Sequence, residues 1–262
     1  MYLPKEIELS KLYLEKIFRD FKGNICLIGG WAVYQLVNNN YHRVTGREYI
    51  GSKDIDVGFH IQKKWTKCEL IKSDFSKFIN YLKEMNFIWQ AFRLFKDYDF
   101  ETMEELTLEE SKKRPPFNIV RIYIDPIIDN IHPLFNHVFG YDPIDEPLLT
   151  LIFEEDLYEE HTIFGINIKI PQTHIILGMK LNSVTKRDKE DKIIKDISDI
   201  YSLMWFSDLE FKDLKIKLYD FYSKVIVEKI LTNFEEEQII KVSESLGVES
   251  SEIKKIFTEF MK

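Results

Sequence analysis

The chain has few cysteines and no long apolar run, and these two absences argue against a disulfide-rich secreted protein and a membrane protein. Its two cysteines, Cys26 and Cys68, form neither a C-x-x-C motif nor a disulfide framework. The N-terminus carries Lys5, Glu6 and Glu8 where a secretory signal peptide needs an apolar segment. No apolar run approaches the roughly 18 residues of a membrane-spanning helix. These features predict a cytoplasmic protein that does not enter a membrane.

Several catalytic motifs are missing too. The sequence has no G-x-x-x-x-G-K-[S/T] phosphate loop, no G-x-S-x-G nucleophile elbow, no H-E-x-x-H and no zinc-like Cys/His spacing. It also lacks an excess of basic residues, because 36 Lys and Arg stand against 44 Asp and Glu for a net charge of −8. This balance argues against broad electrostatic capture of nucleic acid but is compatible with a local RNA-binding patch.

Apolar material is plentiful, and its periodicity predicts an α+β fold. The 262 residues are 45% apolar and include 20 Phe and 13 Tyr, enough for one large domain or two modest ones. Helical or alternating patterns predict helices over 5–21, 30–38 and 72–85 and strands over 24–29, 53–60, 87–95 and 117–125, with 101–114 as an exposed loop or short helix.

The second half of the chain changes from alternating to helical periodicity. Two further strands are predicted at 148–153 and 162–171, the second with a turn or bulge at Gly165-Ile166-Asn167. They are followed by predicted helices over 172–185, 188–205, 208–232, 235–246 and 251–261. We therefore expect a mixed-sheet domain over 1–170 and a C-terminal helical bundle over 171–262 that completes a cleft.

The segment S-K-D-I-D-V-G-F carries the first candidate site residues. In a strand, Asp54 and Asp56 share one face while Ile55 and Val57 turn into the core. Two adjacent carboxylates suit Mg²⁺, which takes a few carboxylates and completes its shell with phosphate oxygens. A D-x-D alone is typical of a solvated strand end, but here apolar neighbours surround the pair, so a bound cation would compensate its charge.

A third acid, Asp125, ends the apolar run F-N-I-V-R-I-Y-I-D-P-I-I. The run predicts a buried strand, and Pro126 cannot donate to a strand ladder, so pairing should weaken where Asp125 appears. If this strand lies beside the one with Asp54 and Asp56, three carboxylates could hold two Mg²⁺ ions for phosphoryl or nucleotidyl transfer. Upstream, the Gly29-Gly30 turn before a helix would let the backbone approach a phosphate.

Together, Gly29-Gly30, Asp54-x-Asp56 and Asp125 resemble the signature of the nucleotidyltransferase superfamily with the DNA polymerase β-like fold. The spacer between Gly30 and Asp54 is longer than in the compact or antibiotic-modifying members. It is more similar to the AbiEii-type branch, the nucleotidyltransferase toxins of abortive-infection and toxin–antitoxin systems, in which a similar K-D-I-D segment occurs. The resemblance covers roughly residues 20–205.

That resemblance extends to a second cluster within residues 171–203. Members of the branch carry a Lys on one helix, an Arg seven residues later and a K-D-x-x-D-I on the next helix; the matching residues are Lys180, Arg187, Lys195, Asp196 and Asp199. The resemblance implies that these residues contribute to nucleotide binding, with Lys180 directed at the triphosphate. The alternative is a solvated helix face with i,i+4 ion pairs.

The resemblance thus implies a Mg²⁺-dependent enzyme that moves a nucleoside monophosphate from an NTP to an acceptor hydroxyl. Gly29, Gly30, Ser52 and Lys53 would contact phosphates, and Asp54, Asp56 and Asp125 would hold two ions. The acceptor would be an RNA, such as a tRNA 3′ end, or a protein, and an antitoxin is a candidate partner. The alternative from another class is a nucleotide-binding or partner-binding protein with the same fold and no transfer activity.

Overall fold

The computed structural model describes residues 3–262, which group into two compact units. We call them the sheet unit, which runs to Ile28 and resumes over Ser52–Ile170, and the helical unit, which comprises Gly29–Gly51 and Pro171–Lys262. The predicted domains, 1–170 and 171–262, also divide the chain after residue 170. They differ in placing residues 29–51 with the sheet.

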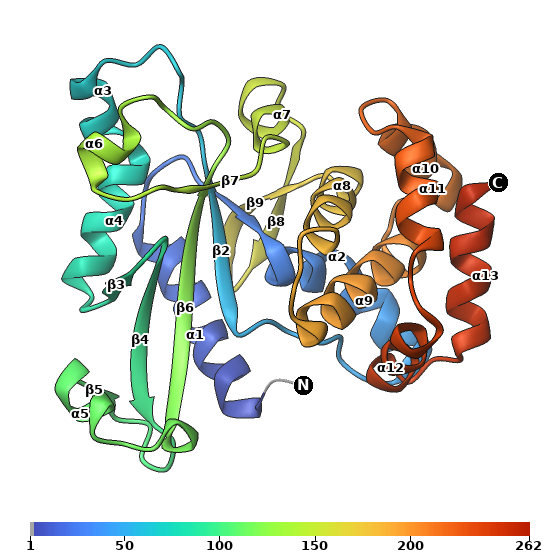
Figure 1. Ribbon diagram of the computed structural model, residues 1–262, viewed down its shortest axis with the longest axis horizontal. Coiled ribbons are helices and arrows are strands. Elements are labelled where there is room, and N and C mark those ends of the chain that lie inside the picture. Colours follow the sequence, from blue (N-terminus) through green and yellow to red (C-terminus); the bar gives the residue numbers. More distant parts are fainter. Residues whose placement is uncertain (1–2) are drawn as a thin grey trace. The chain divides into compact units, whose positions relative to one another are not determined.

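The sheet unit is built on one mixed β-sheet (Figure 1). Its strand order is β1 (Cys26–Ile28), β2 (Asp54–Phe59), β6 (Ile119–Ile128), β4 (Arg93–Asp99) and β3 (Ile88–Gln90), with β5 (Glu105–Leu106) beside β4 and β7 (Ile144–Asp145) beside β6. β6 pairs in parallel with β2 and β7, and the other pairs are antiparallel. A separate antiparallel pair, β8 (Tyr158–Ile163) and β9 (Ile166–Pro171), follows. The α+β class and the mixed sheet followed by helices are as predicted.

The two faces of this sheet differ in chemistry because strand side chains alternate. One face is apolar and carries Ile55, Val57 and Phe59 of β2, all buried. The ring of Phe59 contacts Phe75 of α4 (Asp74–Glu84) with ring centroids 5.4 Å apart. Helix α1 (Pro4–Asp20) packs against β2 and β6 as well. Burying an aromatic side chain contributes roughly 1.5–3 kcal/mol, so this face anchors the unit and leaves the opposite face for polar groups.

Short helices complete the sheet unit: α3 (Lys67–Lys72), α5 (Leu108–Lys112), the 3₁₀ turn η1 (Pro116–Asn118), α6 (Phe135–Phe139) and α7 (Leu149–Glu154). The strand predicted at 148–153 is wrong, because this segment forms α7. A short apolar run fits a strand or a helix equally well by pattern. The helix follows Pro147, which suits a helix start, and buries Leu149 and Ile152, three residues apart on one face.

The helical unit contains α2 (Gly29–Thr45), α8 (Thr173–Val184), α9 (Glu190–Phe206), α10 (Phe211–Tyr219), α11 (Lys224–Thr232), α12 (Glu236–Leu246) and α13 (Ser250–Met261). Helix α9 is central, since α2, α8, α12 and α13 all pack against it and its residues from Asp196 to Met204 are buried. Within residues 3–262 no helix has the length and apolar character needed to cross a membrane.

Other element boundaries differ from the prediction at turns. The strand predicted over 87–95 is two strands, β3 and β4, joined by the two-residue turn Ala91-Phe92. The helix predicted over 208–232 is two helices, α10 and α11. Both of these breaks depend on turns that hydrophobic periodicity does not register. Gly165, with a φ of +72°, lies in the turn between β8 and β9, where the sequence predicts a turn or bulge.

The strand predicted over 117–125 continues through Pro126 to Ile128. The ladder from β6 to β4 ends at Ile124, and the ladder to β7 begins at Ile127. Pro126 therefore lies in the gap between these two neighbours, where a missing N–H is tolerated. On its other side, β6 stays paired with β2 throughout, which keeps Asp125 in a fixed register.

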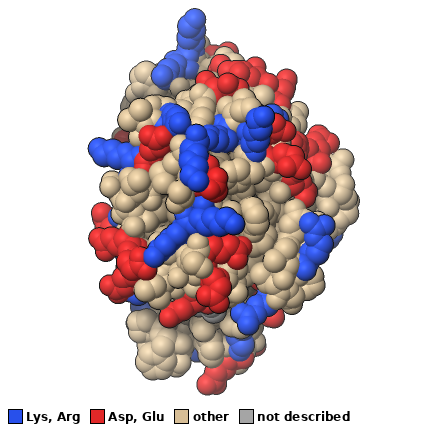
Figure 2. Space-filling model, turned by 90° about the vertical axis from the view of Figure 1, so that its right-hand side faces the viewer, with Lys and Arg blue, Asp and Glu red and all other residues tan. Residues whose placement is uncertain are grey.

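One surface of the molecule carries both signs of charge side by side (Figure 2). On the helical unit, Lys241 pairs with Glu237 at 2.8 Å and also with Glu190, and Lys254 pairs with Glu236. Exposed pairs of this kind contribute little to stability, so their main effect is to mix the charges. This face has no broad basic field, in keeping with the net charge of −8.

Candidate functional site

Three predicted site residues lie together on the polar face of the sheet unit. Strands β2 and β6 are parallel, and their register places Asp56 opposite Asp125 and Asp54 opposite Tyr123. Paired residues of neighbouring strands point to the same face, so all three carboxylates share it. Asp54 and Asp125 are each only 6% exposed, and Asp56 is half-buried. The structure therefore brings Asp54, Asp56 and Asp125 together from segments about seventy residues apart in the chain.

The electrostatics of Asp125 reflect this crowding. Burial and the negative charge of Asp56 raise the pKa of its carboxyl to about 7, with a further contribution from Asp54 and opposition from Arg93. Like charges held at short range disfavour ionisation of one another. A carboxyl that titrates near neutral pH is suited to accept and release protons under cellular conditions.

Arg93, the first residue of β4, is a member of the cluster that the sequence analysis missed. It precedes Leu94, which pairs with Ile124 of β6, the neighbour of Asp125, and its Nε donates to Asp125 Oδ1 at 2.9 Å while its Nη2 donates to Oδ2. Burial lowers the pKa of Arg93, but the charges of Asp125, Asp54 and Asp56 outweigh that effect and raise it. In the sequence, Arg93 stands within an apolar strand pattern that does not mark it as a site residue. Its position becomes apparent only from the turn at Ala91-Phe92, after which β4 begins at Arg93.

A second Arg–Asp pair continues the polar face along the same two strands. Arg121 of β6 lies opposite Asp97 of β4, with Nε 2.5 Å from Oδ1 and Nη2 2.7 Å from Oδ2. Its guanidinium carbon lies 4.2 Å from the centroid of the Phe95 ring. Strand β2 begins at Asp54, opposite Tyr123, so no β2 residue pairs with Arg121. This second pair lacks the neighbouring acids of the first.

The chemistry of the three carboxylates fits a hard divalent cation. Oxygen ligands at closely spaced positions are what Mg²⁺ takes, and Asp54 and Asp56 offer them from one strand. Over residues 3–262, however, no three His, Cys, Asp or Glu side chains form a ready-made metal cluster. Asp125 directs both of its oxygens to Arg93. The donor set is thus suitable for a metal, but one of its members is engaged by a guanidinium.

The predicted phosphate-contacting residues divide between the two units. Gly29 and Gly30 begin α2 in the helical unit, and Gly29 has a φ of +66°, a conformation that favours glycine. Its predecessor Ile28 pairs with Asp56, so the sharp turn follows directly in the chain. Ser52 and Lys53 belong to the sheet unit; Ser52 is buried, and Lys53 Nζ lies 3.7 Å from Glu6 Oε1.

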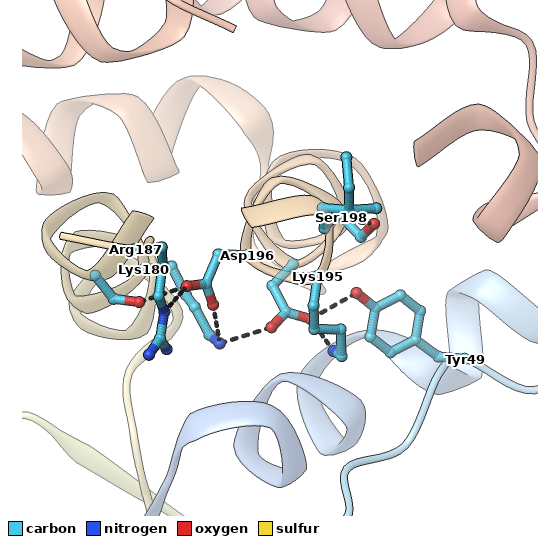
Figure 3. A network of polar contacts seen from close by, with 9 residues as sticks. Tyr49, Lys180, Arg187, Lys195, Asp196 and Ser198 are labelled. Carbon is cyan, nitrogen blue, oxygen red and sulfur yellow. Dashed lines mark hydrogen bonds and ion pairs between the residues drawn. The ribbon is translucent and has the colours of Figure 1, made fainter. Parts of the chain in front are cut away.

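The second predicted cluster forms a buried ionic network inside the helical unit (Figure 3). Asp196 of α9 accepts hydrogen bonds from Lys180 at 2.8 Å, from Ser183 at 2.6 Å and from Arg187 Nε at 2.8 Å. Lys180 Nζ also lies 2.7 Å from Asp199 Oδ2, so this lysine bridges two carboxylates one helical turn apart. The structure therefore brings together all five residues of the predicted set, since Lys195 pairs with Asp199.

Tyr49 is a further member that the sequence analysis did not identify. It lies between β1 and β2 in the chain but belongs to the helical unit, where its hydroxyl donates to Asp199 Oδ1 at 2.7 Å. Lys195 Nζ lies 5.0 Å from the centroid of the Tyr49 ring. No local pattern around residue 49 indicates this partner, because the contact spans 150 residues.

Burial affects the pKa values of the residues in this network. Asp196 is 2% exposed and Asp199 is fully buried, so the alternative of a solvated helix face is wrong. Burial works against the charged forms, but Lys180 and Arg187 lower the pKa of Asp196, and the two aspartates raise the pKa of Lys180. Lys195 is different, because burial and the charge of Lys180 outweigh Asp199 and lower its pKa. The predicted nucleotide contacts of these residues stay a prediction.

Comparison with known proteins finds a likeness in structure but none in sequence. The sequence matches no protein-family model and no curated protein. The structure is similar to the crystal structure of an antigenic nucleotidyltransferase-like protein from Paracoccidioides brasiliensis, with 15% sequence identity, 93% of each chain covered and a TM-score of 0.44. The AbiEii-type branch stays a prediction from the sequence motifs.

Proposed function

We propose that the protein is a Mg²⁺-dependent nucleotidyltransferase that moves a nucleoside monophosphate from an NTP to an acceptor hydroxyl and releases pyrophosphate. The observation that carries this proposal is the parallel register that sets Asp56 beside Asp125, with Asp54 on the same face. Three buried or half-buried carboxylates at one place cost folding free energy unless a cation compensates them. The motif resemblance, Gly29-Gly30 with Asp54-x-Asp56 and Asp125, supports the same reaction.

The three acids would divide the chemistry among them. Asp54 and Asp56 would hold one Mg²⁺, and Asp125 would hold a second. When bound, two such ions align and stabilise the attacking and leaving oxygens of an in-line displacement. Asp125 would also help to deprotonate the acceptor hydroxyl.

The contribution of the helical unit to phosphate binding rests on side-chain exposure. The side chains of Lys180 and Lys195 are about one-tenth exposed and engaged with aspartates, whereas the Arg187 side chain is 40% exposed. Arg187 binds Asp196 through Nε. Among these three cations, Arg187 is the best suited to contact a phosphate.

The acceptor and the biological role follow from the sequence resemblance. AbiEii-type enzymes act as toxins, so we propose an RNA such as a tRNA 3′ end, or a protein, as acceptor and an antitoxin as partner. The two thiols of Cys26 and Cys68 are free, as in proteins of a reducing cytoplasm. The mixed charges of Figure 2 favour recognition of an acceptor through a local surface.

A second candidate is a nucleotide-binding protein without transfer activity. The observation that favours it is the bidentate contact of Arg93 with Asp125, which occupies both oxygens of one predicted metal ligand. Titration calorimetry with each NTP, in the presence and absence of Mg²⁺, separates the two candidates. An enzyme of the proposed kind binds NTP only with Mg²⁺, whereas a simple binding protein does not depend on the metal.

The proposed activity is tested by incubating the protein with each α-³²P-labelled NTP, Mg²⁺ and either total RNA or cell lysate. We expect one NTP to label a discrete RNA or protein species, because nucleotidyl transfer leaves the α-phosphate on the acceptor. Chelation of Mg²⁺ by EDTA should abolish labelling, and γ-labelled NTP should give none. Absence of labelled product with every NTP and both acceptor pools would contradict the proposal.

A further inference from the structure

Arg93 is placed at Asp125 by the tip of a hairpin. Gln90 and Arg93 close the two-residue turn between β3 and β4, in which Ala91 has a φ of +56°. A positive φ is unfavourable for a residue with a side chain, so the surrounding structure holds this turn in place. The turn starts β4 at Arg93, and the next residue, Leu94, pairs with Ile124 of β6, which adjoins Asp125.

The guanidinium is held from several sides. Two parallel N–H donors engage the two oxygens of Asp125, the geometry in which arginine binds carboxylates most strongly. The guanidinium carbon lies 4.3 Å from the centroid of the Tyr123 ring and 5.3 Å from that of Phe92. Cation–π contacts of this kind add roughly 0.5–2 kcal/mol. Each oxygen of Asp125 has a second lone pair, so a metal ion that takes one of them would lie close to the guanidinium unless Arg93 moves away.

The charges around Arg93 distinguish it from the second pair on the same face. Asp125 has Asp56 beside it and Asp54 nearby on β2, and the charges of all three acids act on Arg93. Arg121 pairs with Asp97, and no β2 residue pairs opposite Arg121. Both arginines lie over aromatic rings and both use a bidentate contact. Only the first pair therefore has further carboxylates beside it on a neighbouring strand.

Resting on the proposed function, we propose that Arg93 is a resident counter-cation of Asp125 that must be displaced before a divalent ion binds this carboxylate. A guanidinium and a divalent ion repel each other at the separation that a shared carboxylate imposes. Asp54 and Asp56 would then bind metal first, and Asp125 would join only when Arg93 moves away. The displaced guanidinium is a planar donor that matches phosphate oxygens, so an incoming nucleotide would stabilise the displaced position.

This arrangement makes metal and nucleotide binding cooperative. Without nucleotide, Arg93 competes for Asp125 and weakens metal binding there. With nucleotide, the triphosphate provides negative charge for both the metal and the guanidinium, so the competition is relieved. The site would then assemble fully only when a nucleotide is present, which limits metal-dependent side reactions.

The inference is tested by titrating the full-length protein with Mn²⁺ in the absence of nucleotide and following free Mn²⁺ by electron paramagnetic resonance. Arg93→Gln should bind Mn²⁺ more tightly by on the order of tenfold, because it removes the competing charge and leaves Asp125 free for the metal. Arg121→Gln is the matched control, since it breaks the equivalent pair at Asp97. We expect it to leave Mn²⁺ affinity unchanged.

Two further variants make the result specific. In Arg93→Gln/Asp125→Asn the gain in Mn²⁺ affinity should disappear, because the carboxylate that binds Arg93 has been removed. If circular dichroism shows that Arg93→Gln does not fold, Arg93→Lys takes its place. Lysine keeps the charge but loses the two-donor fork, so a smaller gain in Mn²⁺ affinity is expected.

The outcomes separate this inference from the proposed function. If the wild-type protein binds Mn²⁺ and the folded Arg93 variant binds it equally or more weakly, the role of Arg93 is overturned while the metal site stands. An equal gain in Arg121→Gln would overturn it too, because the effect would then be general charge removal. If neither the wild-type protein nor any variant binds Mn²⁺, the inference and the proposed metal-dependent function both fall.

Discussion

Replacing Asp56 by asparagine is expected to reduce nucleotide transfer by on the order of 10³-fold, because a bound metal supplies several kcal/mol of transition-state stabilisation and each ~1.4 kcal/mol is tenfold in rate. Asp56 lies between Asp54 on its own strand and Asp125 on the next, so its loss affects both proposed ions. The amide keeps the size of the side chain and removes one of three crowded negative charges. The fold should therefore persist, as measured by circular dichroism and thermal melting.

The matched control for this variant is Asp145→Asn. Asp145 lies on β7 of the same sheet and is exposed, and its register partner is Ile128 rather than an acid. It should retain full transfer activity. Wild-type rates of α-³²P incorporation in a folded Asp56→Asn protein would show that Asp56 is not a metal ligand of the reaction.

Replacing Asp196 by asparagine is expected to destabilise the helical unit by about 3–5 kcal/mol, the cost of removing one partner from a buried ion pair. The variant would leave Lys180 with Asp199 as its carboxylate partner and would offer Arg187 and Ser183 a neutral amide in place of a carboxylate. Because Lys180 is only 8% exposed, solvent compensates its charge poorly. The loss should appear as a lower urea midpoint of unfolding, with the free energy obtained by linear extrapolation.

Asp191→Asn on the same helix provides the control for this measurement. Asp191 is exposed in the first turn of α9, where a negative charge contributes only about 0.3–1 kcal/mol through the helix dipole. A destabilisation by Asp196→Asn no larger than that of Asp191→Asn would mean that the network does not stabilise the unit. The ion pairs of Figure 3 would then have to be explained by ligand binding instead.

The acids of the site could be predicted from the sequence because strand geometry is local. Alternation puts Asp54 and Asp56 on one face, and an apolar run that ends at Asp125 indicates a core strand. What the sequence does not contain is the register that joins the two strands. The structure supplies it through the parallel pairing of β2 with β6, which sets Asp56 opposite Asp125.

Arg93 could not be predicted, because its position depends on a turn without a sequence signal. Ala91 adopts a positive φ, which is typical of glycine or asparagine, so the hairpin was interpreted as one strand. Tyr49 was missed for a related reason, since its partner Asp199 is 150 residues away. The burial of Lys180 and Asp196 was unexpected as well, because charged residues at helical spacing usually face solvent.

The most direct test of the central claim is a crystal structure of the wild-type protein with Mn²⁺ and a non-hydrolysable NTP, with anomalous scattering used to locate the metal. We predict Mn²⁺ peaks about 2.0–2.6 Å from carboxylate oxygens of Asp54 and Asp56, with the triphosphate bound to the same ions. A second peak at Asp125, with Arg93 displaced, would complete the arrangement. Nucleotide bound without Mn²⁺ at these carboxylates, or Mn²⁺ bound elsewhere on the protein, would contradict it.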